Sequence, residues 1–397
     1  MTNNTKIVIA LFVIDIFANL LAPFSKYYIS NIEVYLDIMC FFTVLTNKNI
    51  LISTKNIDIA LKYFVACGLI IFIPIICFGN LPFTTAISRL LFAISFILLK
   101  TEIKKRIYIL FVKYFVILLT LGIIEWVLLF FGTNFFWSSV YREGTQEFKQ
   151  GLFILVPSYY IFGNYRFMSL CTEPGGLGTI CFFLLATLDS NKYKKQYIII
   201  LFAGLISFSL GFYVLIVLWF LTQFKKFKIS QIFVGVVVVT IMLNFFGDFF
   251  NARIVERLIN VDSVEELDNR SNEAVDEKLE EISNDYRFLV GMGNRNFYKW
   301  KAESDGVSAG VKNFLLQYGV LGLIIYFVSF SRLIIRIRGF NKQTLILVAF
   351  VWLCFYKSSI WNSPPVLLPL LTVLYTTPVY QYKLLSKTCE YESNKTS

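Results

Sequence analysis

The segment from Arg166 to Gly178 holds residue types that can handle protons and anions within one short stretch. Arg166 and Glu173 lie seven residues apart, and Glu173 directly precedes Pro174. Proline is favoured at the first position of a helix, which predicts a helix beginning at Pro174 with Thr172 or Glu173 as its cap. The free N–H groups of such a helix can hold an anion, or Glu173 can accept a proton from a hydroxyl group. A helix cap and a loop salt bridge explain the same residues equally well.

A second group of polar residues lies in the stretch 248–310. Six positions recur there at helical spacing, with Glu and Asp on the opposite face: Val264, Leu267, Ser271, Val275, Leu279 and Ile282. This pattern predicts an amphipathic helix lying over a bundle of other helices. Arg270 and Arg287 interrupt its acidic surface, although as salt-bridge partners they would need no function.

The residue inventory excludes several kinds of chemistry. The chain has no His, which removes His-based zinc sites and Ser/His/Asp triads. Its 7 Cys show no C-x-x-C spacing and none lies in the stretch 248–310. Any acid or base is therefore a carboxylate, Lys, Tyr or Cys. No Asp-x-Asp motif suggests a divalent cation, and we expect neither a metal nor a cofactor.

Composition sets the surroundings in which these residues work. Apolar residues make up 57% of the 397 residues, charged residues only 16%, and the mean hydropathy is +0.66. The apolar residues form long blocks such as Tyr197 to Leu221, which match the length a helix needs to cross roughly 30 Å of hydrocarbon. The sequence predicts an all-α polytopic membrane protein.

The net charge of +11 is distributed unevenly. The stretch 248–310 carries 14 acidic and 8 basic residues, a net charge of −6, so the remainder of the chain carries +17. The basic surplus flanks the apolar blocks, where it sets topology, and nucleic-acid binding is not expected.

The apolar blocks and their connectors predict about twelve crossings. By the positive-inside rule, the Lys- and Arg-rich connectors and both termini are cytoplasmic, and one long loop is extracytoplasmic. We expect a transmembrane bundle over 1–247 with an outer or re-entrant segment at 133–174, the extracytoplasmic loop at 248–310, and C-terminal helices with a cytoplasmic tail over 311–397. The blocks lie at about 7–24, 32–46, 57–78, 81–99, 107–131, 175–188, 197–221, 229–247, 311–331, 344–357 and 364–380.

The block 197–221 has two interpretations. If both of its basic flanks are cytoplasmic, it crosses twice or dips into the membrane and returns, with the break at Ser207 to Gly211. In the competing interpretation Leu152 to Phe162 is a span and 197–221 crosses once. We favour the first, because the eleven residues from Leu152 to Phe162, interrupted by Pro157, make a poor span and a better re-entrant segment.

Several ionisable residues fall inside the predicted spans. Each would cost about 2.5–3.5 kcal/mol if it faced lipid at mid-bilayer, so we expect them to face the bundle interior. Arg89 and Glu125 lie nearer the outer ends of their helices and are predicted to pair. The full set is Asp15, Asp37, Lys62, Arg89, Lys113 and Glu125.

The order of these motifs resembles that of bacterial O-antigen polymerases of the Wzy type, which are related to O-antigen ligases. The resemblance covers most of the chain, although each motif is loose. It runs through Arg166 to Gly178, the Ser209 to Gly211 break, Arg270, Gly291-x-Gly293, and the entry into the next span at Asn313-Phe314-Leu315 and Gly319-x-x-Gly322.

Two departures from the family pattern matter. Leu210 stands where relatives often have an Arg, which makes that break purely structural here. Lys312 stands where many ligases have a His, which favours a polymerase over a ligase.

The resemblance implies metal-independent, inverting glycosyl transfer between oligosaccharide repeats carried on undecaprenyl pyrophosphate, on the periplasmic face of the inner membrane. The departing pyrophosphate needs guanidinium groups, and Glu173 or, second, Asp305 would activate the acceptor hydroxyl. The candidate anion- and glycan-binding residues are Arg166, Arg270, Arg287, Arg253, Arg295 and Asn313. A chain-length regulator protein is the expected protein partner.

Two other functions remain open. An O-antigen ligase shares the architecture but transfers the glycan to lipid A-core. A flippase for the same lipid-linked oligosaccharide also has about twelve spans, often with internal repeats and charges near the midplane. No such repeat is evident in this chain.

Overall fold

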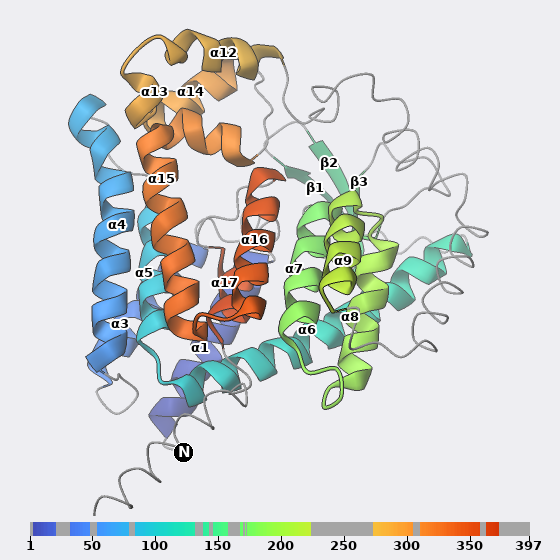
Figure 1. Cartoon of the computed structure of the whole chain (residues 1–397). Helices are drawn as coiled ribbons and strands as arrows, with labels where there is room; N and C mark the ends of the chain where they lie inside the picture. The colour runs from blue at the N-terminus through green and yellow to red at the C-terminus, as the bar shows by residue number, and fades with distance from the viewer. Residues whose placement is uncertain are drawn as a thin grey trace, which may run out of the picture.

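The computed structural model of the chain describes residues 3–20, 32–47, 54–78, 84–131, 138–142, 146–157, 167–169, 171, 173–223, 273–304, 310–357 and 363–372. Helices dominate this part of the chain, and one small sheet accompanies them (Figure 1). The elements are α1 Asn3–Leu20, α3 Ile32–Thr46, α4 Thr54–Phe78, α5 Thr84–Leu98, α6 Thr101–Phe130, β1 Ser138–Arg142, β2 Gln146–Gln150, β3 Leu155–Pro157, α7 Pro174–Thr187, α8 Lys194–Ile206, α9 Leu210–Gln223, α12 Glu273–Ser283, α13 Arg287–Val290, α14 Asn294–Ser304, α15 Gly310–Arg338, α16 Lys342–Lys357 and α17 Pro364–Leu371.

Within the described residues, four helices are long and apolar enough to cross a membrane: Asn3–Leu20, Asn56–Phe78, Thr101–Leu129 and Gly310–Arg338. Shorter apolar helices cover Ala86–Leu98, Pro174–Thr187, Leu210–Thr222 and Lys342–Tyr356. Large apolar side chains such as Leu61 and Phe64 on α4 are exposed, as expected of helices that face lipid. The prediction of a helical membrane protein is confirmed, whereas the total of about twelve crossings stays a prediction.

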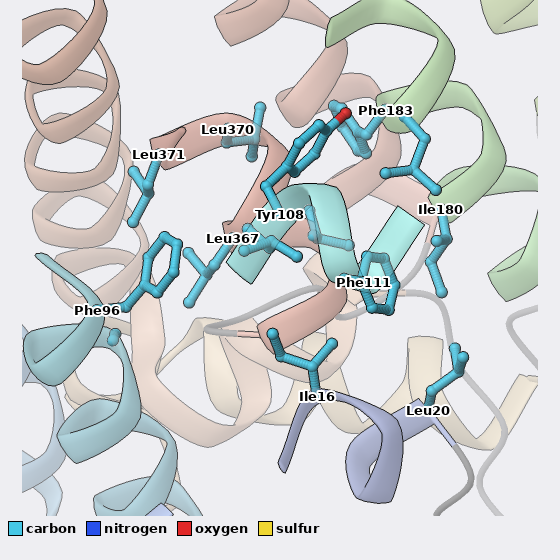
Figure 2. Packing of buried hydrophobic residues seen from close by; sticks show 14 of the residues in the cluster. Ile16, Leu20, Phe96, Tyr108, Phe111, Ile180, Phe183, Leu367, Leu370 and Leu371 are labelled. Atoms are coloured by element: carbon cyan, nitrogen blue, oxygen red, sulfur yellow. The ribbon is translucent and has the colours of Figure 1, made fainter. Parts of the chain in front are cut away.

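The short helix α17 lies at the centre of the bundle. All of its residues are buried, and it packs against α1, α5, α6, α7 and α15. Figure 2 shows Leu367, Leu370 and Leu371 of this helix surrounded by side chains from α1, α5, α6 and α7. A helix of this length is about 12 Å long, too short to cross a bilayer. The predicted span at 364–380 is therefore a buried helix over 364–371, and the rest of that block lies outside the described residues.

Arg338 supplies hydrogen bonds to the carbonyl groups at the buried C-terminal end of α17. Its Nη1 donates to the carbonyl oxygens of Pro369, Leu370 and Thr372, at 3.1, 3.3 and 3.1 Å. The last carbonyl groups of a helix have no partner within the helix, and a cation at that end also interacts well with the helix dipole. The basic end of α15 is thereby joined to the core.

The block 197–221 folds back on itself. α8 and α9 are separated by Ser207, Phe208 and Ser209, with Phe208 at φ 46°. The hydroxyl of Tyr213 donates to the carbonyl of Leu205, across the break, at 2.6 Å. Two helices of about 20 Å thus form a hairpin, in agreement with the interpretation that the block reverses at this break.

The direction of α9 follows from its neighbours. Phe212, near its start, packs beside Gly178 at the start of α7. Trp219, near its end, and Phe182 of α7 both contact the ring of Phe350, at 6.4 and 5.0 Å between centroids. α9 therefore runs in the same direction as α7, and α8 runs in the opposite direction.

The sheet lies in the segment 133–174 and was not predicted. Its strand order is β1-β2-β3, all antiparallel, with Ser138 opposite Gln150 and Phe148 opposite Pro157. Residues 152–157 are loop and strand rather than helix. The competing interpretation, a membrane span over 152–162, has no support from these residues.

A cap layer, which we define as α12, α13 and α14, covers the start of α15 (Figure 1). Val275 and Ile282 of α12 are buried with Met292, Phe297 and Leu316. The predicted amphipathic helix is confirmed over 273–283, and its first half lies outside the described residues. Figure 1 places the sheet and the cap layer on the same side of the bundle.

Candidate functional site

Four of the predicted site residues lie in the described part of the chain: Glu173, Arg287, Arg295 and Asn313. Glu173 precedes α7, whereas the other three belong to the cap layer or to the first turn of α15. The remaining four, Arg166, Arg253, Arg270 and Asp305, lie outside the described residues. The four described residues thus belong to two parts of the fold, the start of α7 and the cap layer with the start of α15.

Glu173 occupies the N-cap position of α7, and Pro174 is the first helical residue, as predicted. Its backbone is extended, at φ −142° and ψ 139°, and its carbonyl accepts the first helical N–H, from Leu177, at 3.2 Å. The Glu173 side chain makes no capping hydrogen bond and is half-buried. The helix start is therefore formed by the backbone and Pro174, without use of the carboxylate as a cap.

The chain before Glu173 is anchored by an aromatic residue. Phe167 is fully buried, and its ring packs edge-on against Trp126 of α6 at 6.2 Å. Its backbone N–H donates to the carbonyl of Ile206, the last residue of α8, at 3.2 Å. The approach to Glu173 is therefore held between α6 and the α8–α9 break.

The start of α7 has one crowded and one open glycine. A Cβ at Gly178 would lie 3.0 Å from the Cβ atoms of both Ser209 and Phe212, so the close contact with the α8–α9 break favours glycine. A Cβ at Gly176 would meet nothing within 4 Å. The first turn of α7, next to Glu173, therefore has an open side at Gly176 and a packed side at Gly178.

Glu125 organises the segment that links the sheet to this region. Its Oε1 accepts the N–H of Leu152 at 2.8 Å, and its Oε2 accepts the N–H of Phe153 at 2.7 Å. Gly151 lies so close that a Cβ there would sit 2.0 Å from Oε1. The carboxylate is buried and satisfies two N–H groups that otherwise have no partner in a loop.

The predicted pair between Arg89 and Glu125 is wrong. Arg89 instead lies 3.7 Å from Asp37, from its Nη1 to the Asp37 Oδ2, deep in the bundle. Asp15 and Asp37 are both fully buried. The backbone N–H groups at 152 and 153 supply the partner that an arginine was expected to provide.

The cap layer is held to α15 by a close crossing of two backbones. The N–H of Met292 donates to the carbonyl of Leu316 at 2.7 Å, and that of Gly293 to the carbonyl of Gln317 at 3.1 Å. Gly291 and Gly319 have φ of 80° and 67°. Both glycines are needed for this conformation, which L-residues with a side chain rarely adopt.

The two backbones at this crossing leave no room for a side chain. A Cβ at Gly291 would lie 2.3 Å from the carbonyl oxygen of Gln317, and one at Gly319 2.3 Å from that of Leu289. At Gly319 the backbone leaves the helical conformation inside α15. The motif Gly291-x-Gly293, uninformative by itself, thus fixes the cap layer onto the bundle.

Arg287 is engaged by acidic neighbours in the cap layer. Its Nε pairs with Asp285, and its Nη2 lies 3.3 Å from Glu281. The hydrogen bond to Asp285 raises the pKa of Arg287, and hydrogen bonding from Lys278, with Arg287 adding to it, lowers that of Glu281. This geometry is that of a salt-bridge partner, so a ligand would have to share Arg287 with these carboxylates.

Arg295 and Asn313 have different settings. Arg295 is exposed on the first turn of α14, while Asn313 is half-buried in the first turn of α15. The neighbouring Lys312 bridges to Asp276 of α12, with 2.7 Å between Nζ and Oδ1. Lys312 thereby ties the start of α15 to the amphipathic helix.

The described residues contain no group of three or more His, Cys, Asp or Glu side chains that could hold a metal ion. Their arrangement offers instead a half-buried carboxylate at a helix start, an exposed guanidinium group at Arg295 in the cap layer, and a half-buried amide group at Asn313 in the first turn of α15. Comparison with known proteins adds nothing to this description. No family model, no curated protein and no solved structure matches the chain. The resemblance to O-antigen polymerases therefore depends on the order of the motifs.

Two functional elements escaped the sequence analysis. Glu125 was expected to meet an arginine, although the Gly151 next to its backbone partners could have signalled a close approach. The crossing of Gly291 with Gly319 joins positions 28 residues apart in the chain. No local pattern predicts which glycines meet.

Proposed function

We propose that this protein is a polysaccharide polymerase that joins oligosaccharide repeats carried on undecaprenyl pyrophosphate. One observation carries the proposal beyond the motif order: a polar cap layer is fixed by a glycine crossing onto an apolar bundle, on the same side as the sheet. Such an arrangement suits a substrate whose lipid lies in the membrane and whose sugars lie outside it. In this proposal the cap layer is periplasmic and the basic connectors are cytoplasmic.

The reaction we propose is an inverting displacement. The acceptor hydroxyl oxygen attacks the anomeric carbon of the donor, and the bond from that carbon to the pyrophosphate oxygen breaks with its electron pair. The acceptor proton passes to a carboxylate, for which Glu173 is the first candidate and Asp305 the second. The negative charge that develops on the pyrophosphate is stabilised by guanidinium groups.

The contacts of Arg287 and Arg295 indicate how available each guanidinium group is to bind an anion. Arg295 is exposed, whereas Arg287 is already paired with Asp285 and Glu281. Among the described arginines we therefore propose Arg295 as the more available anion-binding group. Arg166, Arg253 and Arg270 lie outside the described residues and stay candidates on the motif order alone. Asn313 would contact the glycan. Arg287 would chiefly hold the cap layer in shape.

The test is the length of surface polysaccharide in a deletion strain complemented with wild type, Glu173→Gln, Arg166→Ala or Arg295→Ala at matched expression. We expect a ladder from wild type and a single repeat from the Glu173 and Arg166 variants. Lys299→Ala is the matched control, because Lys299 is exposed on the same helix as Arg295. A full ladder from every variant would refute the proposed site, and loss of all repeats in the deletion strain would indicate a ligase.

A second candidate, movement of the lipid-linked oligosaccharide across the membrane, is favoured by a different observation. Asp15 and Asp37 are fully buried with Arg89 inside the bundle, and ionisable residues at such depth often line transport paths. Purified protein in vesicles separates the two functions. A polymerase lengthens lipid-linked chains without moving them, whereas a flippase moves them without lengthening them.

A further inference from the structure

A groove of about 680 Å³ runs between α4 and α15, away from the cap layer. It lies where α4 begins and α15 ends, because the two helices pack along each other in opposite directions. Tyr63 and Leu333 are buried beneath it, and the Tyr63 ring lies 6.4 Å from that of Phe330. The groove is therefore built on a packed floor.

One end of this groove is basic. Arg332, Arg336 and Lys62 line it, together with a single acidic residue, Asp58. Lys62 is paired with Asp58 at 2.8 Å, whereas Arg332 and Arg336 make no ion pair with any residue that the structure describes. The lining thus has a net charge of +2, and its two unpaired guanidinium groups lie one helical turn apart.

The other end of the groove is apolar. Ala66 on α4 and Ile324, Ile325 and Val328 on α15 form its walls, and Ile324 and Val328 are exposed. From Arg336 to Ile324 the helix rises about 18 Å. One leaflet of hydrocarbon is about 15 Å thick, so the groove has the length of an acyl chain in one leaflet.

We propose that this groove binds an anionic phospholipid of the surrounding membrane. Its phosphate lies between Arg332 and Arg336, with Lys62 nearby, and its acyl chains lie along Ala66, Ile325 and Val328. Guanidinium groups match phosphate oxygens in geometry as well as in charge. A zwitterionic lipid cancels its own phosphate charge and gains less from a lining of +2. This site is separate from the cap layer and does not depend on the proposed polymerase activity.

Native mass spectrometry of the full chain tests the proposal, with phosphatidylglycerol and phosphatidylcholine of equal acyl length as probes. We expect wild type to retain phosphatidylglycerol in preference to phosphatidylcholine. Arg332→Gln/Arg336→Gln should lower retained phosphatidylglycerol to the level of phosphatidylcholine. Ala66→Trp, which fills the apolar half without a change of charge, should lower the retention of both lipids.

The matched control is Lys192→Gln/Lys194→Gln, which removes the same charge from exposed positions in and beside the connector between α7 and α8. Size-exclusion chromatography and melting temperature check the fold of each variant, and Lys62→Gln replaces the double variant if that one is misfolded. Retention equal to wild type in the arginine variant, or an equal loss in the control, would overturn the proposal. Displacement of phosphatidylglycerol by a smaller amount of polyprenyl phosphate would assign the groove to the lipid-linked substrate instead.

Discussion

At the residue scale, buried polar groups in this protein are used to position backbone. Glu125 accepts two backbone N–H groups, and the Arg338 guanidinium donates to three carbonyl oxygens of α17 and its end. In both cases a charged side chain satisfies backbone groups that have no partner in regular structure. Their loss should therefore disturb the fold before it disturbs any chemistry.

Replacement of Glu125 tests this role. Glu125→Ala leaves the N–H groups of Leu152 and Phe153 without acceptors, at a cost of about 1–3 kcal/mol for each buried group. We expect a clearly lower melting temperature in detergent, measured by intrinsic fluorescence, and a smaller loss for Glu125→Gln, which keeps one acceptor oxygen. Glu102→Ala, at an exposed position of the same helix, is the control. A Glu125→Ala protein as stable as wild type would show that the segment 151–154 is held by other contacts.

The two glycines at the start of α7 give a matched pair. Gly178→Ala should push α7 away from Ser209 and Phe212, whereas Gly176→Ala places its methyl group in open space. Overpacking of this kind typically costs about 1–3 kcal/mol. Melting temperatures of the two variants should differ, with Gly178→Ala the lower. Equal values would contradict the close packing of α7 on the α8–α9 break.

At the element scale, two helix breaks have different effects on the path of the chain. The break after α8 reverses the chain, whereas Gly319 lets α15 continue after a local departure from helical geometry. The difference lies in the partners: Phe212 and Tyr213 fold back onto α8, while Gly319 receives the cap layer. About 19 residues of α15 remain after Gly319, close to the length of a membrane crossing.

The glycine crossing should control how the cap layer is attached. Gly291→Ala and Gly319→Ala each place a methyl group on opposing backbone at a positive φ, so we expect the cap layer to separate from α15 while the bundle stays folded. Limited proteolysis should then cleave within 273–304 faster than in wild type. Gly68→Ala on α4, where a Cβ makes only an ordinary contact, is the control. Unchanged cleavage in both variants would contradict this role.

At the scale of the whole molecule, the α8–α9 hairpin predicts which segments share one face of the membrane. Because α9 turns back, the residues before α8 and after α9 should lie on the same face of the membrane. Asn191→Cys and Thr222→Cys, both at exposed positions, should react with a membrane-impermeant maleimide from the same side in a Cys77→Ser/Cys389→Ser background. Labelling from opposite sides would restore the interpretation with a single crossing.

The sequence by itself determined that the apolar helices suit a lipid membrane, and it determined several local elements. Long apolar blocks specify membrane helices, Pro174 specifies the start of α7, and the spacing of Val275, Leu279 and Ile282 specifies an amphipathic helix. These signals are local, since each depends on residues within a few turns of one another. The position of a chain break, at Ser207 to Ser209, is local in the same sense.

Only the tertiary structure decided which distant groups meet. It paired Glu125 with backbone N–H groups instead of Arg89, placed α17 at the centre of the bundle, and brought Gly291 against Gly319. Such contacts depend on how the helices pack, and a buried carboxylate accepts any donor that packing brings within reach. Residue types fix which interactions are possible, and the packing of the bundle selects among them.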